Sequence, residues 1–433
     1  MERALAANLG SHEGQRIYLL GWVHTIRRIG EVNFLIIRDR SGLAQAVVGA
    51  QELEPLHGLQ TETVVRVEGD VVATPSTASG YELHNNVITV ITPVTEPLPF
   101  AINKKEIKAN QSVFLDHAVV AYRNPQQRAI YRLAAGVMRS FRETLDQRGF
   151  TEIQTPKLVA SATESGANVF QVDYFGQVAY LAQSPQFYKQ IMVGVFERVY
   201  EIGPVFRAEK HSTIRHINEY VSMDVEFGFI KDHFTVMALL TDLIRNILDQ
   251  LSVRNADDLA SLRATLPVVG DSIPHVHITE GQKLLADVFQ VQDALGEPDL
   301  TPEHERLLCQ WAKEKYDSDF LFVTGYPLAK RPFYTHPDPK RPGYSNGFDL
   351  LFRGMELVTG GQRLHRYEDY VAAARERGYD VTAFETYFEA FKYGMPPHGG
   401  FAIGLERLLL QLLGLDNIRM VTLFPRDMNR LSP

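Results

Sequence analysis

Two arginines lie within the short polar stretch FRAEKHSTIRHINEY, residues 206–220. Arg207 and Arg215 are eight residues apart, and Glu209 follows Arg207 by two. Apolar residues alternate on both sides of KHSTIRHI, which predicts two strands joined by a loop, with Arg207 and Glu209 on one face of the first strand. A guanidinium group binds a carboxylate or a phosphate through two parallel hydrogen bonds. Such a hairpin seen alone is better explained as a solvated turn with surface ion pairs.

A third arginine, Arg407, follows a glycine-rich stretch near the C-terminus. The stretch YGMPPHGGFAIGLERLLLQLLGL, residues 393–415, runs from a Gly/Pro-rich turn into a strongly apolar helix, with Arg407 just after Gly404 and Glu406. Glycines let a ligand approach the backbone closely, and the start of a helix favours anions. Taken alone, the pattern fits an ordinary strand-to-helix junction equally well.

A glutamate in an apolar context, Glu356, lies in GMELVTGGQRLHRYEDY, residues 354–370, and is followed by Thr359, two glycines and Arg363. A carboxylate beside a hydroxyl suits Mg²⁺, which takes few protein oxygens and leaves its other positions to water and phosphate. The alternative is a buried Glu356 paired with Arg363. Three arginine-bearing segments together favour a triphosphate site. The sequence contains neither a P-loop nor a kinase glycine-rich loop, so the ATP site must differ from both of these types.

The elements that position these residues begin with a predicted all-β domain. A chain of 433 residues indicates about two or three domains. Five short segments rich in β-branched residues predict a small barrel of the OB type, although strand count alone also fits another small barrel or a sandwich. These segments are RIYLLGWVHTI (16–26), NFLIIRDR (33–40), LAQAVVGA (43–50), TVVRVEGDVV (63–72) and NVITVITPV (86–94).

The rest of the chain predicts an α+β fold with an antiparallel sheet. Residues 128–150 predict an amphipathic helix, and FTEIQTPKLV predicts a strand broken by Pro156. Helices and strands then mix without a βαβ rhythm, which argues against a Rossmann fold. A mostly helical, polar stretch at about 232–315 is expected to be an insertion or a connecting bundle. The predicted domains are a barrel over 1–100, a linker or hinge over 101–127, and a catalytic domain over 128–433.

The composition limits the kinds of binding partner and the cellular compartment that we expect. The net charge of −8 disfavours a generic nucleic-acid binder, so an RNA partner must be held by local clusters. A single cysteine excludes a disulfide framework and a Cys-based zinc site. No apolar run is long enough to span a membrane, and the N-terminus is too polar for a signal peptide, so we expect a cytoplasmic protein.

The chain resembles the class II aminoacyl-tRNA synthetases, and among them the archaeal-type aspartyl-tRNA synthetases, over nearly its whole length. GFTEIQTPKL (149–158) resembles motif 1, the dimer-interface helix and strand, FRAEKHSTIRHINEY resembles motif 2, and GGFAIGLERL (399–408) resembles motif 3. The resemblance implies a homodimer, a class II catalytic domain, and an N-terminal OB-fold that reads the anticodon.

The amino acid is implied by QSPQFYKQ, residues 183–190, which is closer to aspartyl than to asparaginyl enzymes. Lys189 offers a positive charge to a side-chain carboxylate, and Arg363 matches the family's second cation. Glu164 matches the acid that receives the substrate ammonium, although the family's usual Glu-Gly-Gly or Glu-Gly-Ala is Glu-Ser-Gly here. Thr359 stands where relatives often carry serine. The residues that the resemblance assigns to aspartate are Glu164, Gln186, Phe187, Tyr188, Lys189, Arg207, Thr359 and Arg363.

The resemblance also implies that ATP binds bent over the sheet, with catalytic roles for Arg207, Glu356 and Arg407. Arg207 would bridge the α-phosphate and the substrate carboxylate, Glu209 would touch the adenine, Arg215 and His216 would bind the β- and γ-phosphates, and Arg407 would stack on adenine or clamp the γ-phosphate. Glu356 and Thr359 would hold Mg²⁺, with Asp349 in its outer shell. The residues assigned to ATP are Arg207, Ala208, Glu209, Arg215, His216, Ile217, Glu356, Gly404, Leu405, Glu406 and Arg407.

The implied reaction is ATP-dependent activation of L-aspartate to aspartyl-adenylate, followed by transfer to the 3′ end of tRNA(Asp). No protein nucleophile is required, because positioning and charge neutralisation carry such catalysis. The alternatives are an asparaginyl-tRNA synthetase, a catalytically silent tRNA-binding paralogue that would be expected to lack a motif arginine, and an amidating enzyme that would lack the barrel.

In the barrel, the resemblance assigns the anticodon to Arg27, Phe34, Gln45 and Ala78. Phe34 could instead be a core aromatic, and Arg27, Arg28, Arg38 and Arg40 form a local basic group. Ala78 falls where relatives strict for tRNA(Asp) tend to carry a long basic side chain. This favours a relaxed enzyme that also charges tRNA(Asn), whose product would pass to a tRNA-dependent amidotransferase.

Overall fold

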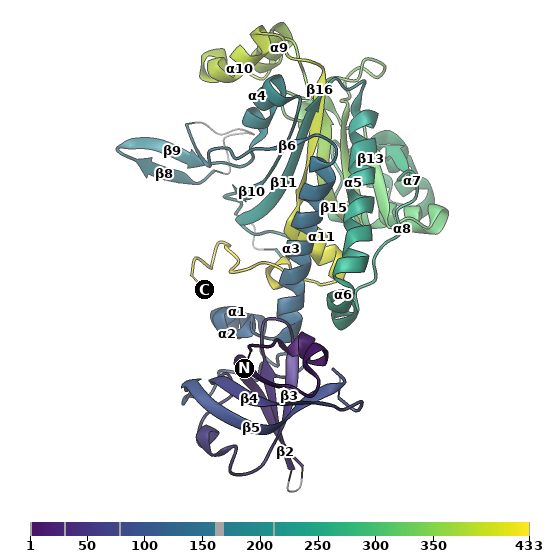
Figure 1. The fold of residues 1–433 in the computed structure, drawn as a ribbon. Helices are drawn as coiled ribbons and strands as arrows, with labels where there is room; N and C mark the ends of the chain where they lie inside the picture. The colour runs from purple at the N-terminus through teal and green to yellow at the C-terminus, as the bar shows by residue number, and fades with distance from the viewer. Residues whose placement is uncertain (1, 30–31, 78, 161–168, 211–212, 433) are drawn as a thin grey trace. The chain divides into compact units, whose positions relative to one another are not determined.

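The computed structural model describes residues 2–29, 32–77, 79–160, 169–210 and 213–432. The chain divides into two compact units, residues 1–125 and 126–433, and each has a hydrophobic core of its own (Figure 1). Within the described residues, no helix combines the length and the apolar character needed to cross a membrane.

The first unit is a closed barrel with the strand order β1-β2-β3-β5-β4. Its neighbours are antiparallel except for β3 and β5. Alternate residues such as Leu35 and Ile37 face the core, as the period of two requires. The predicted small β-barrel is confirmed. Its strands are β1 (Arg16–Ile29), β2 (Val32–Arg38), β3 (Leu43–Val48), β4 (Val64–Ala73) and β5 (Tyr81–Thr92).

Short helices and one buried ion pair complete this unit. Arg38 is buried and donates to both carboxylate oxygens of Glu62, at 2.8 and 2.7 Å. Arg123 also contacts Glu62, at 3.1 Å, which ties the segment after the barrel to β2. Arg38 therefore does not belong to the surface basic group that the sequence predicts. The short helices are η1 (Ala6–His12), η2 (Glu54–Leu56), α1 (Gln111–Asp116) and α2 (Ala118–Ala121).

The second unit is built on an eight-stranded sheet with the order β12-β13-β14-β15-β16-β11-β10-β6. The pairs from β13 to β10 are antiparallel, which confirms the expected α+β architecture. The last strand of the chain, β16, lies between β11 and β15. The strands are β6 (Thr151–Glu152), β10 (Arg198–Phe206), β11 (Glu219–Gly228), β12 (His275–His277), β13 (Phe320–Thr324), β14 (Gly347–Phe352), β15 (Met355–Gln362) and β16 (His398–Gly404).

Most helical side chains of the main core come from α3 (Pro125–Asp146), α5 (His233–Arg254) and α11 (Leu405–Leu413). Helix α3 ends three residues before Gly149, which has a φ of 75°. Helix α5 packs on the sheet through Val236, Leu240 and Leu243. The stretch at 232–315 therefore begins with an apolar helix that belongs to the central core, rather than with a polar insertion.

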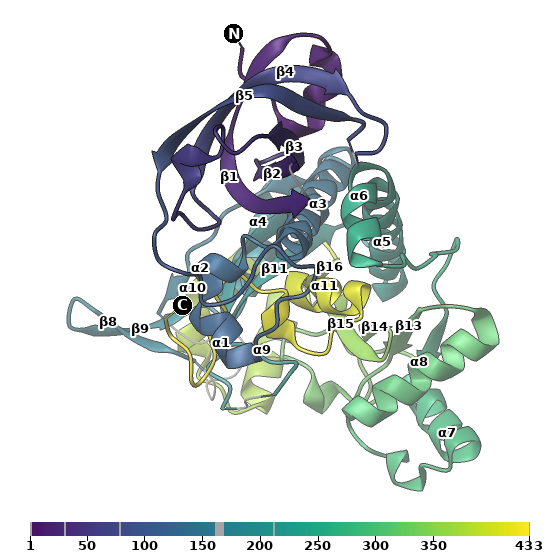
Figure 2. The same cartoon turned by 90° about the horizontal axis from the view of Figure 1, so that it is seen from below.

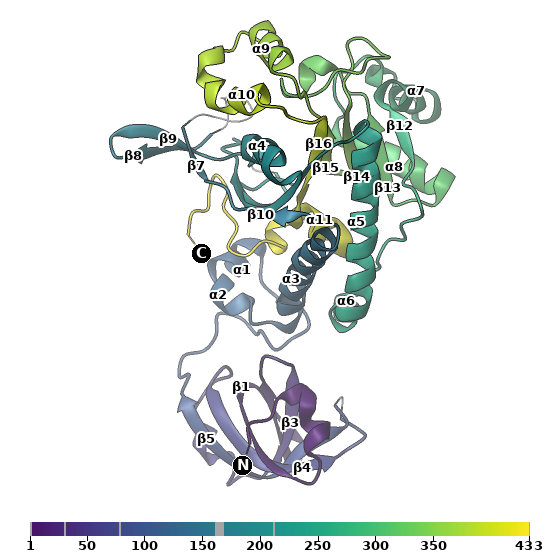
Figure 3. The ribbon, with the colours of Figure 1, turned by 45° about the horizontal axis from the view of Figure 1, so that its top comes forward.

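Smaller elements surround the sheet. Helices α7 (Ile278–Phe289) and α8 (Pro302–Tyr316) share a separate core beside β13 (Figure 2). The strand predicted around Pro156 is divided between two sheets, because β6 joins the large sheet and β7 joins a small one with the order β7-β9-β8. The hairpin of β8 and β9 extends away from the rest of this unit (Figure 3). The remaining elements are β7 (Leu158–Val159), β8 (Gln171–Tyr174), β9 (Gln177–Leu181), α4 (Gln186–Phe196), α6 (Ala256–Leu262), α9 (Tyr367–Glu376), α10 (Glu385–Lys392), η3 (Gln292–Ala294), η4 (Leu328–Lys330), η5 (Val381–Phe384) and η6 (Ile418–Met420).

Candidate active site

Two adjoining cavities lie over the central strands of the second unit. The first has a volume of about 220 Å³ and the second about 290 Å³, and Arg207, Glu356 and Thr359 line both of them. Their common wall comes from β11, β15 and β16, which are neighbours in the sheet. Segments that are far apart in the sequence, from Gln183 to Ile418, thus line one polar space.

The structure brings most of the predicted site residues of this unit to these cavities. Of the residues assigned to ATP, the first cavity is lined by Arg207, Glu209, Arg215, His216, Ile217, Glu356, Gly404, Glu406 and Arg407. Of those assigned to aspartate, the second is lined by Gln186, Lys189, Arg207, Thr359 and Arg363. Residues Ala208, Leu405, Phe187 and Tyr188 line neither cavity, and Glu164 lies outside the described residues.

Phe187 and Leu405 are core residues. The Phe187 ring stacks on Tyr387 with a centroid separation of 4.1 Å and has Phe333 and Tyr334 around it. Leu405 belongs to the main core beneath the sheet. Their neighbours in the sequence, Gln186 and Glu406, reach the cavities instead, because successive residues at a helix start point to different sides.

Arg207 lies just beyond the end of β10, so the prediction that Arg207 and Glu209 share a strand face is wrong. β10 ends at Phe206. The Arg207 N–H still donates to the Asn218 carbonyl at 2.9 Å, and the Asn218 side chain donates to the Arg207 carbonyl at 2.7 Å. This pairing fixes the backbone of Arg207 and leaves its guanidinium group at the junction of the two cavities, 3.8 Å from Glu209.

Glu356 pairs with Arg407, not with Arg363 as the sequence alternative supposed. The Arg407 guanidinium donates to the Glu356 carboxylate at 3.3 Å and to its carbonyl at 3.1 Å. The Thr359 hydroxyl donates to the same carboxylate at 3.2 Å. Asp349 lies opposite Thr359 on β14. Two carboxylates and a hydroxyl therefore stand side by side on two paired strands.

Arg331 is a half-buried part of the site that no sequence pattern indicated. Its guanidinium donates to Asp349 at 2.7 Å and lies over the Tyr326 ring, 3.9 Å from the centroid. Burial raises the pKa of Asp349, and Arg331 opposes that effect. Arg331 follows the short helix η4 in an irregular segment, where no periodicity marks a residue as inward-facing.

Glu305 is a second residue that the sequence did not indicate. It comes from α8, within the stretch at 232–315, and its carboxylate accepts the Glu356 N–H at 3.2 Å and lies 3.6 Å from Arg215. Burial and the nearby Glu356 raise the pKa of Glu305 to about 7. Arg215, which the resemblance assigns to the triphosphate, thus lies beside Glu305, a carboxylate that is protonated at higher pH than usual.

We expect Glu305 and Glu406 each to contribute less to stability as the pH rises from about 4.5 to about 7. Burial raises the pKa of Glu305 and of Glu406 from 4.5 to about 7, so each unfolded carboxyl ionises before the folded one does. At about 1.4 kcal/mol per pH unit, each group should remove up to about 3 kcal/mol of stability over this interval. Urea unfolding of Glu305→Gln should show greater stability than wild type at pH 8 and equal stability at pH 4.

The exposed Glu303→Gln on the same helix is the matched control, and it should unfold like wild type at both pH values. An identical pH slope for Glu305→Gln and wild type would contradict the assignment of this effect to Glu305.

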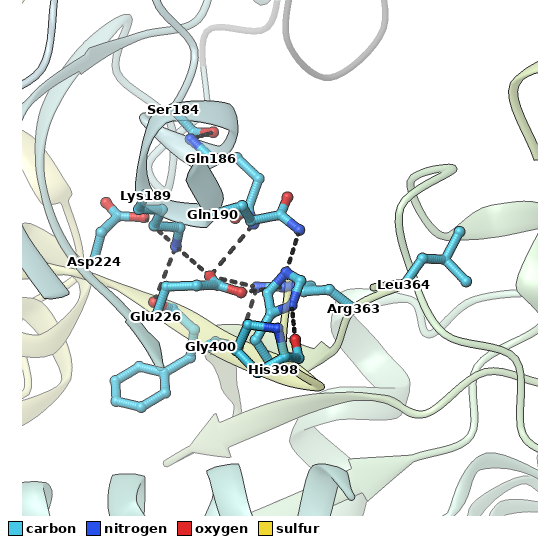
Figure 4. A network of polar contacts seen from close by, with 12 residues as sticks. Ser184, Gln186, Lys189, Gln190, Asp224, Glu226, Arg363, Leu364, His398 and Gly400 are labelled. Carbon is cyan, nitrogen blue, oxygen red and sulfur yellow. Dashed lines mark hydrogen bonds and ion pairs between the residues drawn. The ribbon is translucent and has the colours of Figure 1, made fainter. Parts of the chain in front are cut away.

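Four buried charged side chains lie at one end of the second cavity, namely Lys189, Asp224, Glu226 and Arg363 (Figure 4). Lys189 lies 2.8 Å from Asp224 and 3.4 Å from Glu226. Arg363 lies 3.0 Å from Glu226 and donates to the Gly400 carbonyl at 3.1 Å. Burial alone would raise the pKa of Glu226, but Arg363 and Lys189 lower it below the usual range. Arg363 and Lys189 therefore hold the Glu226 carboxylate in its charged form.

The acids of this group come from the β11 sequence MDVE, where Asp224 and Glu226 are two residues apart in an apolar strand. That spacing was a usable signal, because two carboxylates on one face of a buried strand require cationic partners. Gly400 lies opposite Glu226 on β16, and a side chain there would collide with the Glu226 carboxylate and the Val225 carbonyl. This accounts for one of the glycines before the C-terminal helix.

Three of the barrel residues predicted to read a base, Arg27, Phe34 and Gln45, share one outer face. Arg27 pairs with Phe34 across β1 and β2, and Ile36 pairs with Gln45 across β2 and β3. Phe34 is half-buried and lies outside the core cluster, so the alternative of a core aromatic is wrong. Gln45 donates to Glu82 at 2.9 Å. Ala78 lies outside the described residues.

Comparison with known proteins gives matches to both units. A family model described as tRNA synthetases class II (D, K and N) matches residues 110–428, and one described as an OB-fold nucleic acid binding domain matches residues 17–91, which confirms the OB type of the barrel. An aspartate–tRNA(Asp/Asn) ligase from Thermus thermophilus is 47% identical over 434 residues, with 100% of both chains covered. An aspartate–tRNA(Asp) ligase from Thermococcus kodakarensis is 40% identical over 426 residues, with 97% of each chain covered.

Among solved structures, asparaginyl-tRNA synthetase from Pyrococcus horikoshii complexed with asparaginyl-adenylate superposes with a TM-score of 0.89. The identity is 32%, over 98% of this chain and 97% of that chain. The same backbone therefore serves proteins described for aspartate and for asparagine, so side chains must decide between the two amino acids.

Proposed function

This chain belongs to the class II tRNA synthetases of the D, K and N group, and from that membership we propose that it is an aspartate–tRNA ligase. The observation that carries the choice of amino acid is the presence of Lys189 and Arg363 in the same cavity as Arg207. Two cations suit a substrate whose side chain is a carboxylate, whereas the neutral amide of asparagine would gain little from them. This supports aspartate over the asparaginyl alternative.

ATP occupies the first cavity in this proposal. Arg207 bridges the α-phosphate and the substrate carboxylate from the junction of the cavities, and Arg215, His216 and Arg407 hold the outer phosphates or the base. The α-carboxylate of aspartate attacks the α-phosphorus and pyrophosphate leaves, after which the terminal ribose hydroxyl of the tRNA attacks the adenylate. The protein contributes position and positive charge, so it needs no nucleophile of its own. The silent paralogue is disfavoured because the motif arginines are present.

Mg²⁺ fits the oxygen donors found beside Arg407. Glu356 and Thr359 would hold the ion, with Asp349 in the outer shell, and phosphate and water would supply the remaining ligands. The described residues contain no group of three or more His, Cys, Asp or Glu arranged for a metal. When bound, the ion neutralises phosphate charge.

The proposed partners are tRNA(Asp) and tRNA(Asn), which the barrel reads through Arg27, Phe34, Gln45 and Ala78. The homodimer is proposed to form through residues 149–158, which resemble motif 1 and include β6. Glu164 is proposed to receive the substrate ammonium. We also place the enzyme in the cytoplasm, where an amidotransferase would convert aspartyl-tRNA(Asn) to its amide.

Aminoacylation of both tRNAs tests this proposal directly. We expect the purified enzyme to attach labelled aspartate, and not asparagine, to tRNA(Asp) and to tRNA(Asn), because its relatives include ligases described for both tRNAs. Attachment of asparagine would overturn the amino-acid assignment. Attachment of aspartate to tRNA(Asp) alone would show an aspartate–tRNA ligase that is strict for tRNA(Asp). A third tRNA of unrelated anticodon is the control and should remain uncharged.

A further inference from the structure

A buried polar cluster lies next to Lys189 and Arg363, and Figure 4 shows two of its members, Gln190 and His398, beside Arg363. It consists of Gln190 on α4, Tyr370 on α9, Tyr387 on α10 and His398 on β16, all of which are at least nine-tenths buried. None of the four lines either cavity. The cluster therefore cannot contact ATP or aspartate, yet it joins four elements around the amino-acid pocket.

Gln190 is the centre of the cluster and uses its whole amide group. Its oxygen accepts from the Tyr387 hydroxyl at 2.7 Å, and its nitrogen donates to the Tyr370 hydroxyl and to His398 Nε2, each at 2.8 Å. His398 Nδ1 lies 2.9 Å from the Pro396 carbonyl, which can only accept, so Nδ1 carries the proton and Nε2 accepts from Gln190. The arrangement is thus a directed, fully bonded network.

The network reaches the backbone beside each pocket cation. Gln190 directly follows Lys189 on α4. On the other side, the Tyr370 hydroxyl donates to the carbonyl of Leu364, the residue after Arg363, at 2.9 Å. The His398 carbonyl accepts the Arg363 N–H at 2.9 Å. The Gln190 amide group therefore connects α4, the helix that carries Lys189, to Tyr370 and His398. Tyr370 and His398 in turn hydrogen-bond to the backbone at Leu364 and Arg363.

We propose that Gln190 is a positioning residue for selection of the amino acid, which fixes the separation of Lys189 and Arg363 through Tyr370, Tyr387 and His398. The proposal rests on the proposed function, because it concerns the pocket assigned to the aspartate side chain. Two cations bind one carboxylate well only at a set spacing, and small displacements weaken such binding strongly. Loss of the amide should therefore affect aspartate much more than ATP.

Gln190→Met keeps the length of the side chain and removes its hydrogen bonds. In aspartate-dependent ATP–pyrophosphate exchange we expect KM for aspartate to rise at least tenfold, KM for ATP to stay within twofold, and the preference for aspartate over asparagine to fall. Tyr387→Phe removes one hydrogen bond to Gln190 and keeps the ring on Phe187, so its aspartate KM should rise about two- to fivefold. It serves as the test if Gln190→Met does not fold.

Tyr200→Phe is the matched control. It removes another buried tyrosine hydroxyl, which donates to Asp146 at 2.7 Å away from the cavities, and it should leave both KM values unchanged. An unchanged aspartate KM in a folded variant, or an equal rise in both KM values, would overturn the inference. Absence of aspartate-dependent exchange in the wild type would instead overturn the proposed function.

Discussion

Arg207→Ala should lower kcat/KM for aspartate-dependent ATP–pyrophosphate exchange by roughly 10²–10³ while the protein remains folded. The guanidinium lies at the junction of the two cavities, where the bond between the α-phosphate and the aspartate carboxylate would form. Its side chain is 41% exposed, and the Asn218 hydrogen bonds reach only its backbone, so truncation leaves the local structure in place.

Arg198→Ala is the control for this prediction. Arg198 is similarly exposed at 43%, and it begins the same strand at the end remote from the cavities. The control should exchange pyrophosphate like wild type. Near-wild-type exchange by Arg207→Ala would remove Arg207 from the proposed catalytic role.

Lys189→Met is expected to destabilise the protein and to abolish its use of aspartate. The Lys189 side chain is 1% exposed and lies between Asp224 and Glu226, so its loss leaves buried negative charge without a partner. Removal of one member of a buried pair costs about 3–5 kcal/mol. Loss of a charged contact to the substrate should lower aspartate-dependent exchange by roughly 10² or more. Urea unfolding and pyrophosphate exchange measure the two effects separately.

The double variant Lys189→Met/Asp224→Asn separates stability from recognition. Neutralising Asp224 removes much of the uncompensated charge, so the double variant should regain most of the lost unfolding free energy. Exchange with aspartate should stay low, because the cation is still missing. Recovery of exchange together with stability would show that Lys189 serves the fold and not the substrate.

Local sequence patterns predicted the elements whose partners are close in the chain. The barrel strands follow from short segments rich in β-branched residues, but this pattern did not place Phe34, whose position on the face opposite Leu35 and Ile37 comes from the structure. The C-terminal end of β10 was predicted wrongly, because alternation was the only guide to it. Alternation continues through Glu209, but pairing with β11 stops at the Phe206–Glu219 pair.

The ion pairs of the site could not be predicted, because they depend on strand order. Glu226 and Arg363 are 137 residues apart, and they meet because β16 separates β11 from β15 by one strand. Glu356 is on β15 and Arg363 directly follows that strand, which suggested a pair, yet the register directs Glu356 toward Arg407. Glu305 and Arg331 come from segments without a recognisable motif, and only the folded chain brings them to Glu356 and Asp349.

The place of β16 in the sheet has a consequence for biosynthesis. This strand is made after the other strands of the sheet, but it fills the space between β11, which is completed far earlier, and β15. Until residues 398–404 leave the ribosome, β11 and β15 expose unpaired edges, which are templates for aggregation. A nascent chain that stops short of β16 therefore lacks both the arginine of α11 and the middle of its own sheet, and it should depend on chaperones until the last strand is inserted.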